Sequence, residues 1–394
     1  MKKIACQIKV SLTIAALYAF NSIMAYEIDH LEPPFWWVNM EEEKLQLLVH
    51  GKNISFLQPQ IEYENVEIIS VKRTENNNYL FIDLSIKNAN AGSFDIQFIR
   101  LGKVEAEYRY VLRERSLGSK DREGFDPGDV IYLITPDRYA NGDPRNDSVD
   151  GLREKLKRNN KDGRHGGDIQ GIIDHLGYID QMGFTQLCLN PVLVNDQKTF
   201  SYHGYSTTDF YNIDPRFGDN TLYLELSEKA KARGIGIIKD VILNHIGSKH
   251  WWMDDLPSDD WINNGGNFIN TNHIHESVHD PHLSIFEKNL FTDGWFVKSM
   301  PDLNQRNELL ETYLIQNSIW WIEYANLSGF RVDTYPYVDK NFLSTWSMRI
   351  SSEYPNFNFV GEEWNANPTI VSYWQKDSPR HDDYVSFIPS MMDF

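Results

Sequence analysis

The chain has 394 residues, of which 41% are hydrophobic and 24% charged, a balance typical of a globular protein with room for more than one domain. Its formal net charge is −18, and such an acidic surface argues against nucleic acid or an anionic membrane as a partner. Beyond the first 25 residues there is one cysteine, Cys188, so no intramolecular disulfide is expected.

The first 25 residues have the pattern of a secretory signal peptide. Lys2 and Lys3 precede an apolar stretch that runs from Val10 to Phe20, and Ala25 offers a cleavage position. The apolar stretch is too short to span a bilayer, and no other transmembrane segment is predicted. The sequence therefore predicts export across the inner membrane to the periplasm, with no membrane insertion after the signal is removed.

Residues 26–118 predict an N-terminal, immunoglobulin-like β-sandwich domain. Apolar and polar residues alternate in short runs at 45–49, 66–71, 79–84 and 94–98. Turn residues such as Gly51, Asn53 and Gly92 separate the runs, as expected for short strands packed in two sheets. A polar linker from Ser116 to Gly128 follows.

Residues 119–394 predict an α/β domain in which strands and helices alternate. Continuous apolar strands are expected at 130–134, 185–189, 235–238 and 329–333 and near Asn358 and Tyr384, with helices at 168–182, 221–232 and 308–324. Polar residues just after the strands favour a (β/α)8 barrel, whose sites lie at the carboxyl ends of the strands. The irregular stretch at about 246–299 predicts a subdomain inserted after the third strand.

Three strand-like segments end in polar or charged residues: Asp240-Val-Ile-Leu-Asn-His245, Gly329-Phe-Arg-Val-Asp333 and Phe359-Val-Gly-Glu-Glu-Trp364. Asp333 and Glu362 match the carboxylate pair that retaining hydrolysis of a glycosidic bond needs. Residues two apart share a strand face, so Arg331 is expected beside Asp333, where its charge lowers the pKa of that carboxyl. Taken alone, a carboxylate at a strand end is more often a solvated edge, and an Arg–Asp pair is more often a simple salt bridge.

In order and spacing, these segments resemble those of the α-amylase superfamily of retaining glycoside hydrolases. The resemblance implies that Asp333 is the nucleophile, with Arg331 as its partner, and that Glu362 is the general acid, with a raised pKa. It also implies substrate-binding roles for Asp240, for His245, and for His203 and Tyr205 of the segment Tyr202-His-Gly-Tyr205. Glu363, on the opposite strand face from Glu362, is expected to be structural.

The segment Asn141-Gly-Asp-Pro-Arg-Asn-Asp147 places four oxygen-bearing side chains in seven residues, which suits a hard cation as well as it suits a polar turn. It resembles the calcium loop of neopullulanases and cyclomaltodextrinases. That resemblance implies a structural Ca²⁺ held by Asn141, Asp143, Asn146, Asp147, Gly166 and Asp168. A zinc site is not predicted, because the histidines are scattered and there is no cysteine pair.

The segment Met300-Pro-Asp-Leu-Asn304 resembles the neopullulanase, cyclomaltodextrinase and maltogenic amylase group. Phe35-Trp-Trp37 and Trp251-Trp252 further resemble periplasmic members of starch-utilisation systems. The resemblance implies hydrolysis of α-1,4 bonds, and in some members α-1,6 bonds, in maltodextrins, cyclodextrins or pullulan. The substrate is then an α-glucan oligosaccharide, and a homodimer of the full-length form is left open.

One feature departs from this family. Its third carboxylate belongs to an Asn-His-Asp segment after the seventh strand, whereas this sequence ends at Phe394, near the sixth. We therefore expect a barrel truncated after about six strands, inactive and poorly folded as given. The alternative function is a non-catalytic α-glucan-binding chain. A metal-dependent barrel hydrolase of another class is a third reading, for which only His245 offers a ligand at a strand end.

Overall fold

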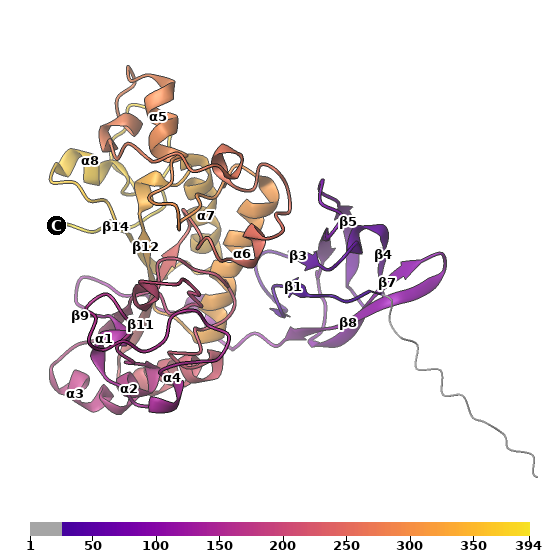
Figure 1. Ribbon diagram of the computed structural model, residues 1–394, viewed down its shortest axis with the longest axis horizontal. Helices are drawn as coiled ribbons and strands as arrows, with labels where there is room; N and C mark the ends of the chain where they lie inside the picture. The colour runs from indigo at the N-terminus through magenta and orange to yellow at the C-terminus, as the bar shows by residue number, and fades with distance from the viewer. Residues whose placement is uncertain (1–25) are drawn as a thin grey trace, which may run out of the picture.

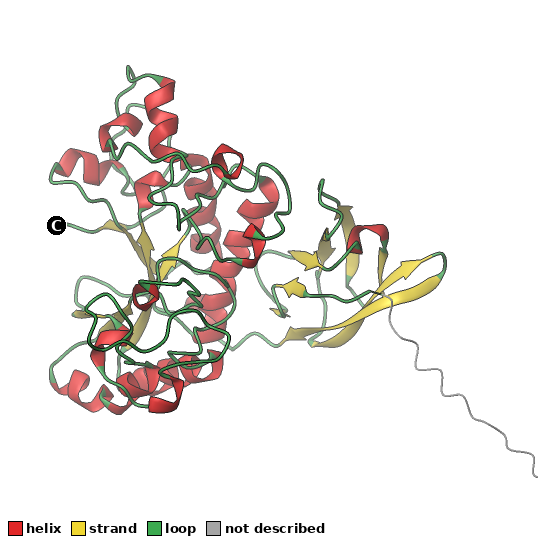
Figure 2. Cartoon of the chain, viewed as in Figure 1, coloured by secondary structure: helices red, strands yellow, loops and turns green. Residues whose placement is uncertain are grey.

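The computed structural model describes residues 26–394, which form a β-rich N-terminal body and a larger body of strands and helices (Figures 1 and 2). The predicted signal peptide, residues 1–25, lies outside the described residues. Among residues 26–394, no helix combines the length and the apolar character needed to cross a bilayer.

The N-terminal body is the predicted β-sandwich. One sheet has the order β1 (His30–Glu32), β3 (Lys44–His50), β6 (Tyr79–Ser85), β5 (Glu67–Lys72), and the other β2 (Trp36–Trp37), β8 (Lys103–Arg113), β7 (Gly92–Arg100), β4 (Gln58–Ile61). Phe94, Ile96 and Phe98 alternate along β7 and are buried between the sheets, as the period of two predicts.

The larger body is built on a six-stranded parallel sheet whose strands pair in chain order. They are β9 (Ile131–Ile134), β10 (Gln186–Leu189), β11 (Gly236–Ile242), β12 (Gly329–Asp333), β13 (Asn358–Gly361) and β14 (Ser390–Met391). Cys188 of β10 is buried, as predicted. This succession of parallel neighbours is the one that a (β/α)8 barrel requires, so the predicted fold class is confirmed.

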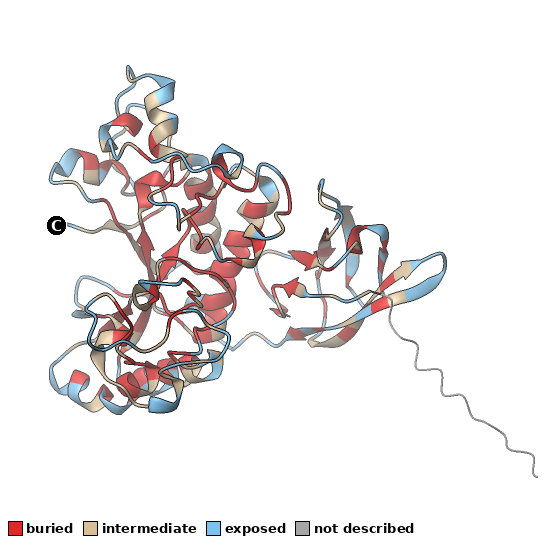
Figure 3. Cartoon of the chain, in the orientation of Figure 1, coloured by how far each residue is buried: buried red, intermediate tan, exposed pale blue. Residues whose placement is uncertain are grey.

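Helices follow the strands and cover the outside of the sheet. They are α1 (Pro136–Tyr139), α2 (Ile169–Asp174), α3 (Leu176–Gln181), α4 (Asn220–Lys231), α6 (Glu308–Ala325), α7 (Lys340–Glu353) and α8 (Pro368–Tyr373). Figure 3 shows that α6 and the central strands form the buried middle of the molecule. Asn307 begins α6 by accepting the main-chain N–H of Leu309 and Leu310, and Asn326 ends it in the left-handed conformation.

Three predicted elements differ from the structure. The helix expected at 168–182 is divided into α2 and α3 at His175, whose ring Nδ1 contacts the carbonyl of Gly171 at 2.7 Å and competes with the helical bonding pattern. The sixth strand lies at Ser390–Met391, whereas Tyr384 lies in a loop, where its hydroxyl contacts that of Tyr335.

Strand β9 is also less buried than its apolar sequence predicts. Tyr132 packs against Phe184 on one face, with ring centroids 4.6 Å apart. On the other face Ile131 and Leu133 are 42% and 60% exposed, because β9 is the edge strand of this sheet in the described residues. An unbroken apolar run predicts a strand that is buried on both faces. It does not indicate which segment of the protein covers each face.

The irregular segment at residues 246–299, hereafter the insertion, leaves the sheet after β11, and its helix α5 lies at the top of Figure 1. It contains short 3₁₀ turns at Trp251–Met253, Asn263–Gly266 and His275–Val278 and one helix, α5 (Ile285–Thr292). The absence of a strand–helix unit here agrees with its sequence.

Contacts at several places fasten the sandwich to the larger body, among them α6, α7 and the insertion. On α6, Gln316 exchanges two hydrogen bonds with the main chain of Gln46, each 2.8 Å long. On the insertion, the carboxylate of Asp255 accepts from Asn78 at 2.8 Å and contacts His50 at 2.9 Å. These contacts fix the sandwich relative to the strand ends described next.

Candidate active site

A pocket of about 380 Å³ lies at the carboxyl ends of the central parallel strands. Residues after β10 and β11, the end of β12 and the residue after β13 contribute to it, together with the end of the insertion. Its lining consists of His203, Tyr205, His245, Phe296, Met300, Arg331, Asp333, Thr334 and Glu362. The structure thus brings six of the seven predicted catalytic and substrate-binding residues to one surface, and the seventh, Asp240, lies directly behind it.

Arg331 connects all three acidic residues of the site. Its Nη1 lies 2.8 Å from both carboxylate oxygens of Asp240 and 2.8 Å from Oδ1 of Asp333. Its Nη2 pairs with Oε1 of Glu362. The strand register explains the arrangement, because Asp240 is the β11 neighbour of Arg331, and Asp333 lies two residues along the same face of β12.

Burial, rather than the nearby cation, dominates the proton equilibria of the aspartates. Removal from water raises the pKa of Asp333 to about 8 and that of Asp240 to about 6, although Arg331 opposes both shifts. The prediction that Arg331 lowers the pKa of Asp333 holds for the effect of Arg331 itself but not for the net pKa, because it left out burial. It counted one neighbour, whereas three carboxylates share a single guanidinium in a desolvated site, so the unliganded pocket retains a proton near neutral pH.

The adjacent Glu362 and Glu363 point in opposite directions. Glu362 faces the pocket, where Oε1 accepts the indole N–H of Trp364 at 2.7 Å and Oε2 accepts the main-chain N–H of Thr334 at 3.2 Å. Glu363 is fully buried on the other side of the chain, where it accepts the indole N–H of Trp374 at 2.9 Å and contacts His275. Only Glu362 can reach a ligand in the pocket.

Tyr205 connects several residues of the pocket wall. Its hydroxyl donates to Oδ2 of Asp240 at 3.0 Å, and its main-chain carbonyl lies 3.0 Å from Nε2 of His245. Its main-chain N–H donates to Nδ1 of His203 at 2.9 Å. Burial lowers the pKa of both histidines to about 4, so at neutral pH they are uncharged rings.

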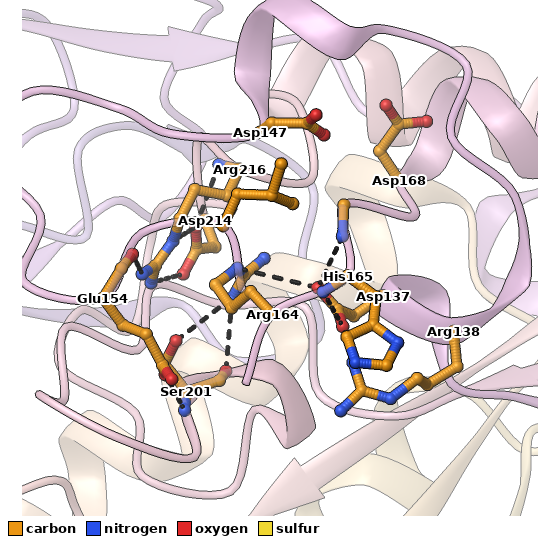
Figure 4. Close-up of polar contacts among 12 residues, drawn as sticks. Asp137, Arg138, Asp147, Glu154, Arg164, His165, Asp168, Ser201, Asp214 and Arg216 are labelled. Atoms are coloured by element: carbon orange, nitrogen blue, oxygen red, sulfur yellow. Dashed lines mark hydrogen bonds and ion pairs between the residues drawn. The ribbon is translucent and has the colours of Figure 1, made fainter. Parts of the chain in front are cut away.

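A buried polar network supports the loop that carries these residues (Figure 4). The main-chain N–H of Ser201 donates to Glu154 at 2.7 Å, and Arg164 reaches the carbonyl of Ser201 at 3.4 Å. The guanidinium of Arg138 lies 3.9 Å from the ring centroid of Tyr202. These contacts hold the chain on the N-terminal side of His203, and therefore the position of its ring.

The predicted calcium ligands gather around Gly166. A Cβ on Gly166 would come within 2.1 Å of Oδ1 of Asp147 and 3.0 Å of Nδ2 of Asn141, and its φ of +85° also favours glycine. The side-chain carbonyl oxygens of Asn141 and Asn146 are buried without a hydrogen-bond partner. Unpaired buried oxygens beside a carboxylate fit a hard cation.

Two of the predicted ligands are engaged elsewhere. Asp143 binds the main chain and guanidinium of Arg145 through both carboxylate oxygens. Asp168, labelled beside Asp147 in Figure 4, accepts the main-chain N–H groups of Gly142, Asp143 and Gly171 and caps α2. Asp147 is also paired, with Nδ2 of Asn141 at 2.6 Å and with the guanidinium of Arg158 at 3.3 Å, but its carboxylate lies against Gly166. The donor set that best fits a cation is Asn141, Asn146 and Asp147 with the main chain of Gly166, a smaller set than the sequence predicted.

Four residues at the pocket escaped sequence reasoning. Thr334 directly follows Asp333, and Trp364 lies two residues after Glu362, so their places at strand ends could have identified them. Met300 begins the segment that resembles the neopullulanase group, and that resemblance does not indicate a place in the pocket. Phe296 lies in the insertion, where no periodic pattern indicates which side chains turn toward the strand ends.

Comparison with known proteins agrees with this geometry. Residues 133–391 match the α-amylase catalytic domain, and residues 30–116 match the N-terminal domain of cyclomaltodextrinases. The chain is 32% identical over 239 residues to an intracellular maltogenic amylase of Bacillus subtilis (60% of this chain, 38% of that protein). It is 32% identical over 245 residues to neopullulanase 2 of Thermoactinomyces vulgaris (60% of this chain, 39% of that protein).

Among solved structures, the acarbose complex of the α-amylase from Geobacillus thermoleovorans matches with a TM-score of 0.51 and 31% identity (62% of this chain, 48% of that chain). The chain spans about two fifths of the length of the two curated relatives named above. With nearly two thirds of its residues matched to the catalytic domain, the chain belongs to the α-amylase family of glycoside hydrolases and carries a cyclomaltodextrinase-type N-terminal domain.

Proposed function

We propose that the pocket binds α-glucan chains and hydrolyses their α-1,4-glucosidic bonds, with activity on α-1,6 bonds as an extension. Maltodextrins, cyclodextrins and pullulan are the substrate classes, and starch catabolism is the physiological setting. The observation that carries the proposal is the pair of carboxylates, Asp333 and Glu362, that share the guanidinium of Arg331 in a pocket large enough for a sugar ring.

The proposed reaction is a double displacement. The carboxylate of Asp333 attacks the anomeric carbon and forms a glycosyl ester, while Glu362 gives its proton to the departing glycosidic oxygen. Glu362 then takes a proton from water, the resulting hydroxide attacks the same carbon, and Asp333 is released as a carboxylate. Two inversions retain the configuration, and the net change is the addition of one water molecule.

The other pocket residues support this scheme by charge and shape. Arg331 favours the ionised form of Asp333 that the first step needs, against the effect of burial. Uncharged His203 and His245 can exchange hydrogen bonds with sugar hydroxyls, and the ring of Tyr205 offers an apolar surface for a pyranose face. Asp240 orients Tyr205 and Arg331 from behind the wall.

Two measurements on the same preparation test the proposal. Acarbose, the ligand in the structure of the Geobacillus thermoleovorans relative, is titrated by calorimetry, and reducing sugar is measured after incubation with maltoheptaose. We expect binding, and sugar release by the same preparation would show that the inactivity expected from the sequence is wrong. Binding without release identifies the non-catalytic glucan-binding alternative, and absence of binding at millimolar acarbose refutes the assignment of the pocket.

We also propose that a structural Ca²⁺ is held by Asn141, Asn146, Asp147 and the main chain of Gly166. The support is the two unpaired buried amide oxygens beside the Asp147 carboxylate. Bound there, the ion supplies positive charge that fixes this loop; it takes no part in bond cleavage. The loop adjoins the network around Asp137, which accepts the main-chain N–H groups of His165 and Gly166 and so connects the loop to the support of His203 (Figure 4).

A periplasmic location is proposed from the basic and apolar pattern of residues 1–25 alone. Expression of the chain with and without these residues tests it. We expect osmotic shock to release the first form, shortened at its N-terminus, and to leave the second in the cells. Retention of both forms refutes the proposal.

A further inference from the structure

We propose that His275 is a positioning residue that fastens the insertion onto the two strand ends that carry Asp333 and Glu362. The consequence for glucan binding rests on the proposed function of the pocket, whereas the fastening itself does not. His275 lies in the 3₁₀ turn His275–Val278, far in sequence from both strands.

Both ring nitrogens of His275 are engaged, each with a residue that belongs to a catalytic strand end. Nδ1 contacts Oε1 of Glu363, the residue after Glu362. Nε2 lies 3.2 Å from the hydroxyl of Tyr337, which follows Asp333 by four residues in the 3₁₀ turn Tyr335–Tyr337. One imidazole thus joins the insertion to both strand ends at once.

The chemistry of the partners fixes the direction of these hydrogen bonds. A carboxylate only accepts, so Nδ1–H of His275 donates to one oxygen of Glu363 while the indole N–H of Trp374 donates to the other at 2.9 Å. On the far side, the Tyr337 hydroxyl also contacts Nδ1 of His273 at 3.0 Å. The groups form a continuous chain from the buried carboxylate to the second histidine of the insertion.

Burial makes this series of hydrogen bonds costly to break. The Glu363 side chain has no exposed surface and that of His275 is 14% exposed. Lifting the insertion away from the strands leaves a buried carboxylate without one of its donors, which is costly in a site that water does not reach. We infer that this cost holds the insertion closed against the strand ends.

The fastening bears on the pocket through aromatic contacts. The Tyr337 ring stacks on Phe291 of the insertion with centroids 4.2 Å apart and packs against Phe296 at 4.6 Å. Phe296 lines the pocket and contacts the ring of His245 at 5.5 Å. Loss of the His275 bonds is therefore expected to loosen the wall that Phe296 contributes, without removing any residue from the pocket.

A separate contact keeps the insertion attached when His275 is changed. Nζ of Lys340 donates to the carbonyl of Val278 at 2.7 Å, and His279 packs edge-on against Tyr373 at 4.3 Å. Variants at His275 are thus expected to fold and to open locally.

The test uses residues 26–394 and three variants. His275→Leu removes both bonds, and His275→Asn keeps an N–H near the position of Nδ1. His282→Leu changes an exposed histidine of the same insertion as a matched control. Hydrogen exchange is followed in peptides from 272–294 and from α6, and acarbose affinity is measured by calorimetry.

We expect His275→Leu to speed exchange at 272–294 and weaken acarbose binding by about tenfold, as for loss of a hydrogen bond to a charged group, while α6 is unchanged. His275→Asn should restore most of the slow exchange and most of the acarbose affinity. His282→Leu should match the unmodified chain in both measurements. If His275→Leu does not fold, Tyr337→Phe, which removes only the hydroxyl, should show the same local increase in exchange.

Unchanged exchange at 272–294 in a folded His275→Leu variant overturns the proposal, as does an equal loss in His282→Leu. These readings are made without ligand and stand apart from the function of the pocket. If the unmodified chain does not bind acarbose, the proposed function fails, and the exchange data still decide the role of His275.

Discussion

The guanidinium of Arg331 lies 2.8 Å from the carboxylate of Asp333, yet burial keeps the pKa of that carboxyl at about 8. The same guanidinium serves Asp240 and Glu362, so its charge is divided among three acids. The proton that the unliganded site holds must leave Asp333 before that residue can attack as a carboxylate. This relationship leads to the first two predictions.

Asp333→Asn should reduce hydrolysis of maltoheptaose by several powers of ten, in any form of the protein that shows turnover, while acarbose still binds. The amide occupies nearly the same volume but cannot form the glycosyl ester, so the loss appears in kcat. Steady-state kinetics and calorimetry measure the two effects. Substantial turnover by the variant contradicts the assignment of the nucleophile.

The stability of the unmodified chain should fall as pH rises from about 6.5 to 8. Asp333 holds its proton up to about pH 8 when folded but loses it near pH 4 when unfolded, so the folded state binds more protons in between and is destabilised as pH rises. The buried histidines act in the opposite sense, but only below about pH 6.5, where the unfolded rings titrate.

Over this pH interval, Asp333 should lower the free energy of unfolding by about 1 to 2 kcal/mol. Denaturant unfolding at four pH values measures it, and Asp333→Asn should flatten the curve. An equal slope in the variant shows that other groups are responsible.

Glu362→Gln should slow hydrolysis strongly, whereas Glu363→Gln should leave the proton donor in place. Glu362 faces the pocket and Glu363 is buried against Trp374 and His275, so only the first can protonate a leaving oxygen. The two substitutions are chemically identical, so each controls for the other. If Glu363→Gln slows hydrolysis more than Glu362→Gln does, then Glu363 and not Glu362 faces the pocket.

The fold could be predicted from the sequence in those elements where apolar residues recur in a regular pattern. The period of two along β7 specifies which face is buried, the apolar run of β12 indicates burial on both faces, and β12 ends at Asp333 as its motif indicates. The division at His175 depends on one side chain bonding to a carbonyl, which no period reveals. The exposure of Leu133 depends on which segment covers β9, a property of the assembled sheet.

The candidate site could be predicted only in part, and the residues at strand ends were the predictable ones. Residues attached to strand ends, such as Arg331 and Glu362, could be placed, because the topology brings strand ends together. Phe296 and His275 reach the same region from an irregular segment, where only the folded path decides their position. The pKa of Asp333 depends on desolvation and on all its neighbours together, and the motif revealed only one of them.

Chelation should lower the melting temperature of the chain if Asn141, Asn146 and Asp147 hold Ca²⁺, because a ligand bound only by the folded state stabilises it by mass action. Asp147→Ala should remove this sensitivity to EDTA. Asp143→Ala, at a residue paired with Arg145, should retain most of it. An unmodified chain that melts at the same temperature with and without EDTA contradicts the site.

The last prediction concerns the exposed face of β9. Ile131 and Leu133 are 42% and 60% exposed on one face of the edge strand of the parallel sheet. Apolar side chains beside unpaired edge groups favour pairing with another chain, and each Å² removed from water contributes about 25 cal/mol. Residues 26–394 should therefore self-associate at micromolar concentration.

Leu133→Lys should shift this association toward the monomer, because a charge at the edge opposes pairing. Leu101→Lys is the matched control: Leu101 is fully exposed, but it lies in the turn between β7 and β8, away from the sheet. Sedimentation velocity at several concentrations distinguishes the three chains. If the unmodified chain is monomeric, the β9 edge does not drive association. An equal shift with Leu101→Lys leads to the same conclusion, because Leu133 lies on the β9 edge and Leu101 does not.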